Sequence, residues 1–92
     1  MNNYSYPILE DWSKEELMTM MKLYNSVEEA YENPNGSNAK NIVDLYKQFQ
    51  MINPAKMEQK QIDRDFANIS GYSLFKTFKA AQLVKKNNVK MD

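Results

Sequence analysis

The chain has 92 residues, 12 basic and 12 acidic side chains, a net charge of zero and no cysteine. This length fits one domain spanning 1–92, and the absence of cysteine excludes disulfides, which in so small a domain is typical of a cytoplasmic protein. The balanced charge excludes a strong overall attraction to nucleic acid, and no segment has the roughly 20 apolar residues of a membrane span, so we expect no membrane partner.

The first segment, 1–12, is rich in aromatic and aliphatic residues, but Pro7 disfavours a helix there. We therefore expect an extended N-terminal arm that packs against the rest of the domain. A helix is predicted for 13–32, with Ser13 as its N-cap and Glu16, three residues later, completing a capping box. Apolar residues follow at spacings of three and four, which places one hydrophobic stripe on this helix.

Three further helices are predicted, for 38–52, 54–69 and 73–86. We expect Asn53 to cap the second of these, with Pro54 at its first position, and Ser73 to cap the last one after a left-handed Gly71. No window shows the alternation of a strand, so no strand is predicted, and the chain is expected to fray from Lys85 on. The fold class is therefore all-α, a compact bundle of about four short helices with an extended N-terminal arm.

Histidine and cysteine are both absent, which removes the commonest general base, the thiolate nucleophile and most zinc ligands. The two glycines do not form a phosphate-binding loop. Asp63 and Asp65, together with Glu58, are the carboxylates on a helix that best suggest a metal or acid–base site, but 63 and 65 point to different sides of a helix, as on a solvated face. We therefore predict that the protein is not an enzyme and binds no cofactor and no metal.

Six tyrosines, four phenylalanines and one tryptophan are more than a four-helix unit of this size can bury completely. Tyrosine combines apolar area with a polar rim and is enriched where proteins meet. We therefore predict an interaction surface that contains four of the six tyrosines: Tyr4, Tyr6, Tyr31 and Tyr72. This surface would serve a protein partner or self-association, with a homodimer as the simplest form. The alternative is partial burial of these rings at the ends of the bundle, with their hydroxyls in water.

The segment 61–79 resembles a helix-turn-helix, with a short helix that contains Ala67, then Gly71 four residues later, and a second helix that carries Lys76 and Lys79. Nucleic-acid binding through Lys76 and Lys79 is therefore the alternative function. A net charge of zero and a single arginine weaken this interpretation, because few phosphates would be neutralised. A helical corner that ends in glycine accounts for the same residues without any nucleic acid.

The charges are distributed unevenly along the chain. Residues 1–36 contain seven acidic residues and two lysines, whereas residues 71–92 contain five lysines and one acidic residue. Either acidic and basic helices attract each other within the fold or between subunits, or the basic end forms a binding face. The first interpretation is the more common one.

Four short motifs occur together in the chain: Tyr4-Ser5-Tyr6-Pro7, Asp11-Trp12-Ser13, Pro54-Ala55-Lys56 and Ser70-Gly71-Tyr72-Ser73. In combination they resemble the YktA-like family of small uncharacterised proteins from Gram-positive Firmicutes, over nearly the whole chain. The resemblance implies a helical bundle and a bacterial cytoplasmic setting, and it implies no activity, cofactor or catalytic residue. The connection 33–38 is longer than this family leads us to expect, so we predict that its tip is dispensable.

Overall fold

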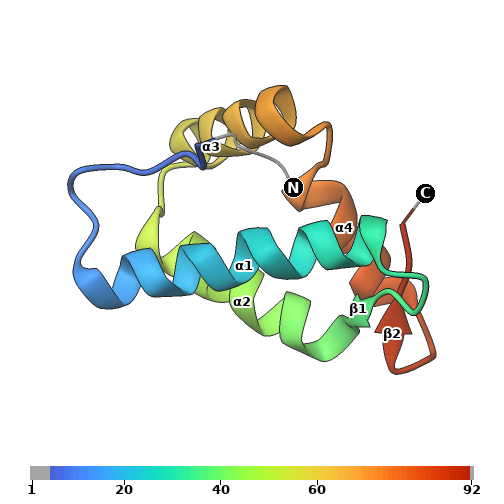
Figure 1. The fold of residues 1–92 in the computed structure, drawn as a ribbon. Coiled ribbons are helices and arrows are strands. Elements are labelled where there is room, and N and C mark those ends of the chain that lie inside the picture. The colour runs from blue at the N-terminus through green and yellow to red at the C-terminus, as the bar shows by residue number, and fades with distance from the viewer. Residues whose placement is uncertain (1–4, 92) are drawn as a thin grey trace.

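The computed structural model describes residues 5–91, and in that range the chain forms four α-helices and two very short strands (Figure 1). In chain order these elements are α1 (Lys14–Glu32), β1 (Ser37–Asn38), α2 (Ala39–Ile52), α3 (Lys56–Ser70), α4 (Leu74–Leu83) and β2 (Asn88–Val89). α1 and α2 pack side by side, α4 packs on α2, and α3 forms the upper layer in Figure 1. The radius of gyration is 12.4 Å, as expected for a compact chain of this length. The predicted all-α fold class is thus confirmed.

Local side chains fix three of the helix starts. The Ser13 hydroxyl accepts from the Glu16 amide (3.1 Å), and the Glu16 carboxylate accepts from the Ser13 amide (2.9 Å), which confirms the capping box of α1. Asn38 caps α2 and Ser73 caps α4 through side-chain oxygens, as expected for Ser73. α3 ends at Ser70, and its C-cap Gly71 has a φ of +83°, the predicted left-handed conformation.

The start of α3 differs from the prediction. This helix begins at Lys56, and its N-cap Ala55 makes no side-chain hydrogen bond. Asn53, which we expected to cap this helix, is instead buried at the end of α2. Its side-chain amide donates to the Phe49 carbonyl (3.1 Å), and its Oδ1 accepts from the Trp12 indole (2.9 Å). Because both polar ends of this side chain are used inside the fold, neither is available to cap α3.

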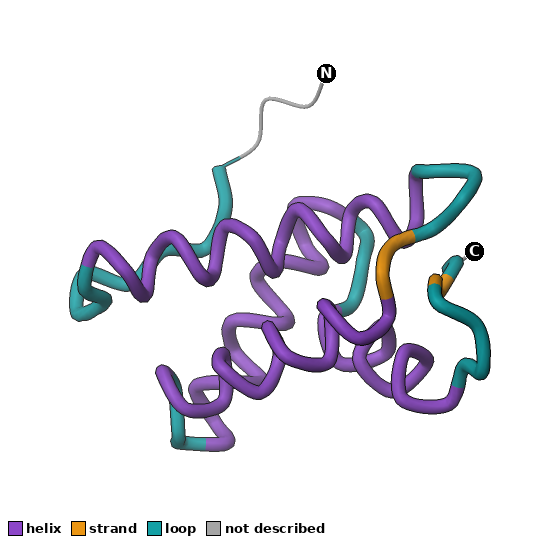
Figure 2. Tube along the Cα trace, turned by 90° about the horizontal axis from the view of Figure 1, so that it is seen from below, coloured by secondary structure: helices purple, strands orange, loops and turns teal. Residues whose placement is uncertain are grey.

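The C-terminal segment forms β2 and does not fray, so the prediction of an all-helical chain without strands is wrong in this detail (Figure 2). β2 pairs antiparallel with β1, with Val89 opposite Ser37. The Met91 amide donates to the Ala30 carbonyl at the end of α1 (2.7 Å). α4 accordingly ends at Leu83 and not at 86, because the chain turns back toward β1. Strands of two residues contain no alternation that a sequence window can reveal.

The connection between α1 and α2 is part of the packed structure, so the prediction of a dispensable tip is wrong. Gly36 is buried, with a φ of +73°, and a Cβ atom at this position would fall on the carbonyl oxygen of Val89. The Asn35 carbonyl accepts from the Asn88 side chain (3.0 Å). The C-terminal segment therefore holds the tip in place, through residues too far apart in the sequence for a local pattern to reveal.

The N-terminal arm packs on the core, as predicted. Tyr6 stacks on Tyr24 of α1, with ring centroids 5.1 Å apart, and Tyr24 stacks on Phe66 of α3 at 4.9 Å. The Tyr24 hydroxyl donates to the Pro7 carbonyl (2.8 Å). The arm thereby joins α1 to α3. The main core receives side chains from all four helices, namely Met20, Leu23, Tyr24, Val27, Leu45, Tyr46, Phe49, Ile62, Phe66, Leu74 and Phe78.

Each helix is amphipathic and buries one face against the core. The longest of the helices in residues 5–91 is α1, with 19 residues. Across this described part of the chain, no helix combines the length and the hydrophobicity that crossing a lipid bilayer requires.

Candidate functional site

Three of the four tyrosines in the predicted interaction surface lie along one side of α1, and Tyr4 lies outside the described residues. The rings of Tyr31 in α1 and Tyr72 at the corner between α3 and α4 stack with centroids 4.2 Å apart and an angle of 9°. Tyr6, in the arm, stacks on Tyr24. The structure therefore brings Tyr6, Tyr31 and Tyr72 to one helix, and each ring already has an aromatic neighbour.

The hydroxyls of this tyrosine surface contact carboxylates of α1. Tyr6 donates to Glu28 (2.7 Å), and Tyr72 donates to Glu32 (2.7 Å). Burial, followed by the charge of Glu32, raises the pKa of the Glu28 carboxyl. The hydrogen bond to Glu32, followed by burial, raises the pKa of Tyr72 to about 12, so this phenol stays neutral at neutral pH. These contacts hold the arm and the corner on α1, and partner binding through this surface stays a prediction.

The predicted helix-turn-helix consists of α3, the glycine corner and α4. Lys76 and Lys79 are exposed on α4. Asp63 of α3 occupies the start of α4, where its Oδ1 accepts from the Leu74 amide (2.7 Å) and its Oδ2 from the Phe75 amide (3.3 Å). A recognition helix presents this end to the nucleic acid, where a carboxylate repels phosphate. Nucleic-acid binding through the two lysines stays a prediction, and the occupied helix N-terminus weakens it.

A groove with a volume of about 520 Å³ lies between α2, α3 and α4. Tyr46 of α2 and Ala67 of α3 line it, together with Phe75 in the first turn of α4, which is 50% exposed. The neighbouring Leu74 is completely buried in the core. Two adjacent apolar residues are therefore divided between the core and the groove. A volume of roughly 300–1,000 Å³ is usual for sites that bind small ligands.

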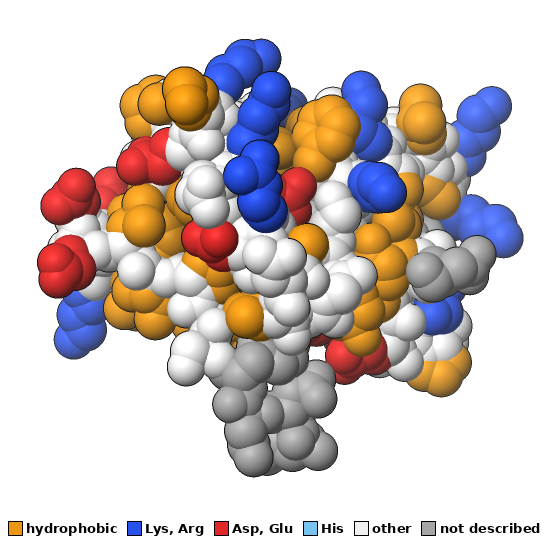
Figure 3. Space-filling view, turned by 90° about the horizontal axis from the view of Figure 1, so that it is seen from above, with side chains coloured by type: hydrophobic (Ala, Val, Ile, Leu, Met, Phe, Trp, Pro, Cys, Tyr) orange, Lys and Arg blue, Asp and Glu red, His pale blue; other side chains and the backbone are white. Residues whose placement is uncertain are grey.

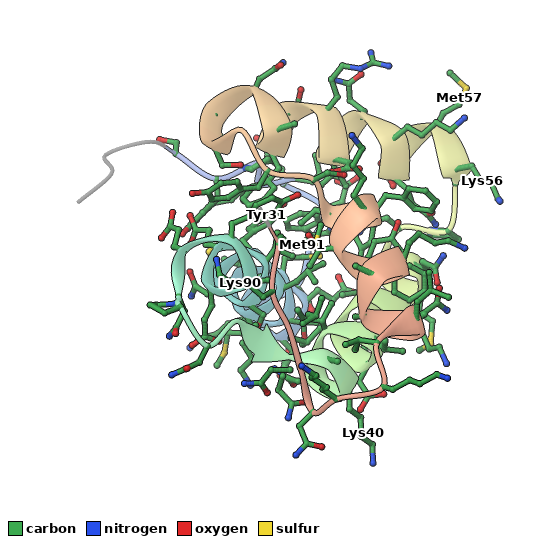
Figure 4. All side chains as sticks on the ribbon, turned by 90° about the vertical axis from the view of Figure 1, so that its right-hand side faces the viewer. Tyr31, Lys40, Lys56, Met57, Lys90 and Met91 are labelled. Carbon is green, nitrogen blue, oxygen red and sulfur yellow. The ribbon has the colours of Figure 1, made fainter. Side chains whose placement is uncertain are left out.

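Basic side chains line the groove on the α3 side: Lys56, Lys60 and Arg64. None of these three forms a hydrogen bond or an ion pair with the described part of the chain. Figure 3, which looks onto α3, shows Lys and Arg side chains beside exposed hydrophobic side chains. Lys56 and the adjacent Met57 project outward from the start of α3 (Figure 4). This face therefore combines free positive charge with exposed apolar area.

Tyr46 is a largely buried residue that lines the groove. The residue is 5% exposed, and its ring stacks on Phe78 with centroids 4.1 Å apart and packs edge-on against Phe49. Its hydroxyl has no hydrogen-bond partner among residues 5–91. Burial, followed by the charge of Asp63, raises the pKa of Tyr46 to about 12. A phenol hydroxyl can both donate and accept a hydrogen bond, so this group is suited to bond a ligand in the groove.

The carboxylates considered above as a metal or acid–base site are engaged separately. Asp63 caps α4, whereas Asp65 accepts from the Gln61 side chain (2.8 Å). In residues 5–91, no three His, Cys, Asp or Glu side chains lie close enough together to hold a metal ion. Asp63 therefore serves to fix the angle between α3 and α4.

Comparison with known proteins identifies bacterial relatives of this chain. Residues 3–90 match the model of UPF0223, an uncharacterised protein family. The chain belongs to this family. The UPF0223 protein of Streptococcus pneumoniae (strain CGSP14) is 40% identical over 88 residues, 96% of this chain and 94% of the relative. The UPF0223 protein of Bacillus cytotoxicus is 37% identical over 86 residues, 94% of each chain.

Membership of UPF0223 confirms the expected resemblance to an uncharacterised family from Gram-positive bacteria. The family description and the names of these relatives state no activity, so no catalytic or binding role is carried over to residues of this chain.

Sequence reasoning missed the groove of this UPF0223 protein, although two signals in the sequence indicate it. Leu74 and Phe75 are adjacent in one helix, and successive helical side chains point about 100° apart, so a narrow core contact cannot take both. The cations of α3 recur at every fourth residue, which aligns them on one face of a helix. Only the tertiary fold shows that Tyr46 of α2 meets these two faces.

Proposed function

We propose that this UPF0223 protein is a non-enzymatic interaction module that holds a segment of a protein partner in the groove between α2, α3 and α4. One observation carries the proposal: the half-exposed Phe75 lies in the same groove as the buried Tyr46, whose hydroxyl has no partner among residues 5–91. Aromatic residues and arginine are enriched where proteins meet. We assign the interaction to the cytoplasm, because a small domain without cysteine suits a reducing compartment.

The residue content of the chain supports binding over catalysis. The sequence contains no histidine and no cysteine, which are the commonest general base and the most reactive nucleophile in proteins. Asp63 is the carboxylate that lines the groove, and its oxygens accept hydrogen bonds from the first turn of α4. The groove thus offers apolar area, positive charge and the Tyr46 hydroxyl, which are means of holding a partner.

Photo-cross-linking from the groove tests this function. Phe75 is replaced by p-benzoylphenylalanine, and the tagged protein is irradiated in a lysate of a Gram-positive bacterium. The matched control carries the same group at Leu83, which is 78% exposed on α4 and does not line the groove. We expect discrete protein adducts, or an adduct with a second copy of the chain, from position 75 only. The absence of protein adducts above the level of position 83 contradicts the proposal.

Nucleic-acid binding is the second candidate function, favoured by the exposed cations on α3 and α4, namely Lys56, Lys60, Arg64, Lys76 and Lys79. It predicts an affinity for DNA or RNA that falls steeply with salt concentration and drops further in a Lys76→Ala/Lys79→Ala variant. An affinity that does not respond to salt removes this candidate. If nuclease treatment of the lysate abolishes the adducts from position 75, nucleic-acid binding becomes the first candidate.

A further inference from the structure

We propose that the groove binds an acidic segment of its partner, with an apolar side chain of that segment packed against Phe75 and its carboxylates facing the cations of α3. This inference rests on the proposed function and specifies the chemistry of the partner. It is drawn from the charge of the groove, from the spacing of its cations and from the hydroxyl beside them.

The cations form a regular row along α3: Lys56, Lys60 and Arg64. Side chains four residues apart lie on one face of a helix, about 6 Å apart along its axis. An acidic segment offers carboxylates at a matching interval, at every fourth residue of a helix or at every second residue of an extended chain, about 6.6 Å apart. Since none of the three cations has an ion-pair partner among residues 5–91, their charge is available to such a segment.

Among the lining residues that the structure describes, Asp63 carries the one carboxylate, and it does not cancel this charge. Asp63 accepts from the Leu74 amide (2.7 Å), the Phe75 amide (3.3 Å) and the Ser73 hydroxyl (3.4 Å). It lies at the N-terminus of α4, where the positive end of the helix dipole balances a carboxylate. The cations of α3 therefore determine the charge that a partner meets.

The rest of the groove supplies an apolar contact and a hydrogen bond. Half of the Phe75 surface is exposed, and covering it would remove apolar area from water, which is the main source of affinity in protein association. The Tyr46 hydroxyl can donate to a carbonyl or carboxylate oxygen of the bound segment. An apolar contact beside a cationic row fits a peptide that has both kinds of side chain.

A nucleic acid would also contact the cations, but the groove has few exposed rings on which its bases could stack. Proteins that bind single strands stack successive bases on several exposed rings. Phe75 is exposed in the groove, whereas Phe78 and Phe49 cover the ring of Tyr46. The net charge of zero also gives no long-range attraction for phosphates. The observations therefore favour an acidic protein segment.

The test uses two fluorescent peptides of about 14 residues, which share the same leucine and phenylalanine positions on one helical face. All charged positions are glutamate in one peptide and lysine in the other. Fluorescence anisotropy at about 50 mM salt measures both affinities, and amide resonances of the ¹⁵N-labelled protein locate the contact. We expect the acidic peptide to bind about tenfold more tightly or better, with shifts at Ala67, Ser73 and Phe75.

Charge reversal tests whether the row of cations on α3 is responsible for binding the acidic peptide. Lys60→Glu should lower the affinity for the acidic peptide about fivefold or more, because an attraction is replaced by a repulsion. The matched control, Lys40→Glu, makes the same change at the start of α2, on the opposite side of the molecule from Lys56 in Figure 4, and should leave the affinity unchanged. Phe75→Ala should weaken binding as well. All three side chains are exposed, so the fold is retained.

Equal affinity for the two peptides, or no resonance shift at about millimolar peptide, overturns the acidic-segment proposal. Tighter binding of a fluorescent oligothymidine than of the acidic peptide overturns it too. The cross-linking experiment gives a separate answer, because it samples natural partners. A cross-linked segment that is neutral or basic overturns the acidic-segment proposal and leaves the interaction function standing, whereas the absence of any protein adduct overturns the function itself.

Discussion

Gly36 and Gly71 share a backbone conformation but differ in what surrounds them. Their φ angles are +73° and +83°, in the left-handed region that disfavours side chains. A Cβ atom at 36 would fall on the carbonyl oxygen of Val89, whereas nothing lies within 4 Å of a Cβ atom at 71. Gly71 is therefore needed for its conformation alone, and Gly36 is needed for its conformation and for the close approach of the C-terminal segment.

We expect Gly36→Ala to lower the free energy of unfolding by about 3 kcal/mol or more, and Gly71→Ala by about 1–2 kcal/mol. The first variant must displace the Val89 backbone in addition to bearing the strain of a left-handed alanine. Urea unfolding followed by circular dichroism measures both values. Equal losses in the two variants would mean that the contact with Val89 does not contribute.

Glu28 gives the stability of this protein a dependence on pH. Burial, followed by the charge of Glu32, raises the pKa of the Glu28 carboxyl above its ordinary value of 4.5. The folded state therefore binds this proton more tightly than the unfolded state does. Consequently the contribution of Glu28 to stability is most favourable below pH 4.5 and falls as the pH rises through the raised pKa.

We expect Glu28→Gln to be more stable than the wild type at about pH 7 and no more stable at about pH 4. Glutamine keeps an acceptor oxygen for the Tyr6 hydroxyl and removes the partly buried charge. Urea unfolding at both pH values measures the difference, with the exposed Glu10→Gln as a control. A variant that is less stable at about pH 7 would show that the charged hydrogen bond to Tyr6 outweighs the cost of burial.

Among the elements, the two-residue strand β2 has an effect out of proportion to its length. It places Val89, which is 3% exposed, in a small hydrophobic cluster with side chains of α1, α2 and α4, namely Ala30, Ala39, Ile42 and Ala81. Three of these four neighbours are alanines, so Val89 provides much of the apolar volume that fills the space between the helices.

We expect Val89→Ala to lower the free energy of unfolding by about 1–2 kcal/mol. The control Leu83→Ala removes a larger but exposed side chain and should cost less than about 0.5 kcal/mol. Urea unfolding measures both, and hydrogen exchange of the Ala39 amide, which donates to the Asn87 carbonyl (2.9 Å), reports whether the strand pairing loosens. Unchanged stability of Val89→Ala would contradict this role for β2.

Element boundaries can be predicted from the sequence where a neighbouring side chain determines them. Ser13 and Ser73 bond amides three residues away, so the starts of α1 and α4 are visible in a short window. The start of α3 is not, because the side chain of Asn53 is bound by Trp12 from a different part of the chain. β2 exists only through its pairing with β1 and has no local signal of its own.

The candidate site, like the element boundaries, could be predicted from the sequence only in part. The aromatic content predicted exposed tyrosines, but the sequence does not reveal that the rings of Tyr31 and Tyr72 stack on each other. It shows the spacing of the cations on α3, yet a groove forms only because Tyr46 of α2 and Phe75 of α4 lie next to that row. Contacts between helices that are distant in sequence decide where the surface is hollow.

In the whole molecule, the N-terminal arm supplies contacts to α3 that direct packing between helices supplies elsewhere in the fold. α3 has fewer contacts with α1 and α2 than these two helices have with each other. The arm supplies additional contacts between α1 and α3, because Tyr6 stacks on Tyr24, which in turn stacks on Phe66 of α3. Trp12 adds a hydrogen bond to Asn53, just before α3 begins. The position of α3, and hence the shape of the groove, depends on the arm.

Removal of residues 1–9 should therefore release α3 before the other helices. We expect hydrogen exchange of the α3 amides to become about tenfold faster or more, while α1 and α2 keep their protection. Mass spectrometry of exchanged peptides measures this, with Ile8→Ala, a change at an exposed side chain, as the control. A uniform loss of protection in all helices would mean that the molecule opens as a single cooperative unit.

The pairing of β1 with β2 also determines when the fold is completed during synthesis. Ser37 pairs with Val89 across more than half of the chain, and closing so long a loop is slow compared with forming neighbouring helices. α1 and α2 can dock as soon as both have left the ribosome, but the cluster around Ile42 stays open to water at that stage. Folding is therefore completed only after β2 has been translated, and a chain stalled before Asn88 would expose this cluster to proteases and chaperones.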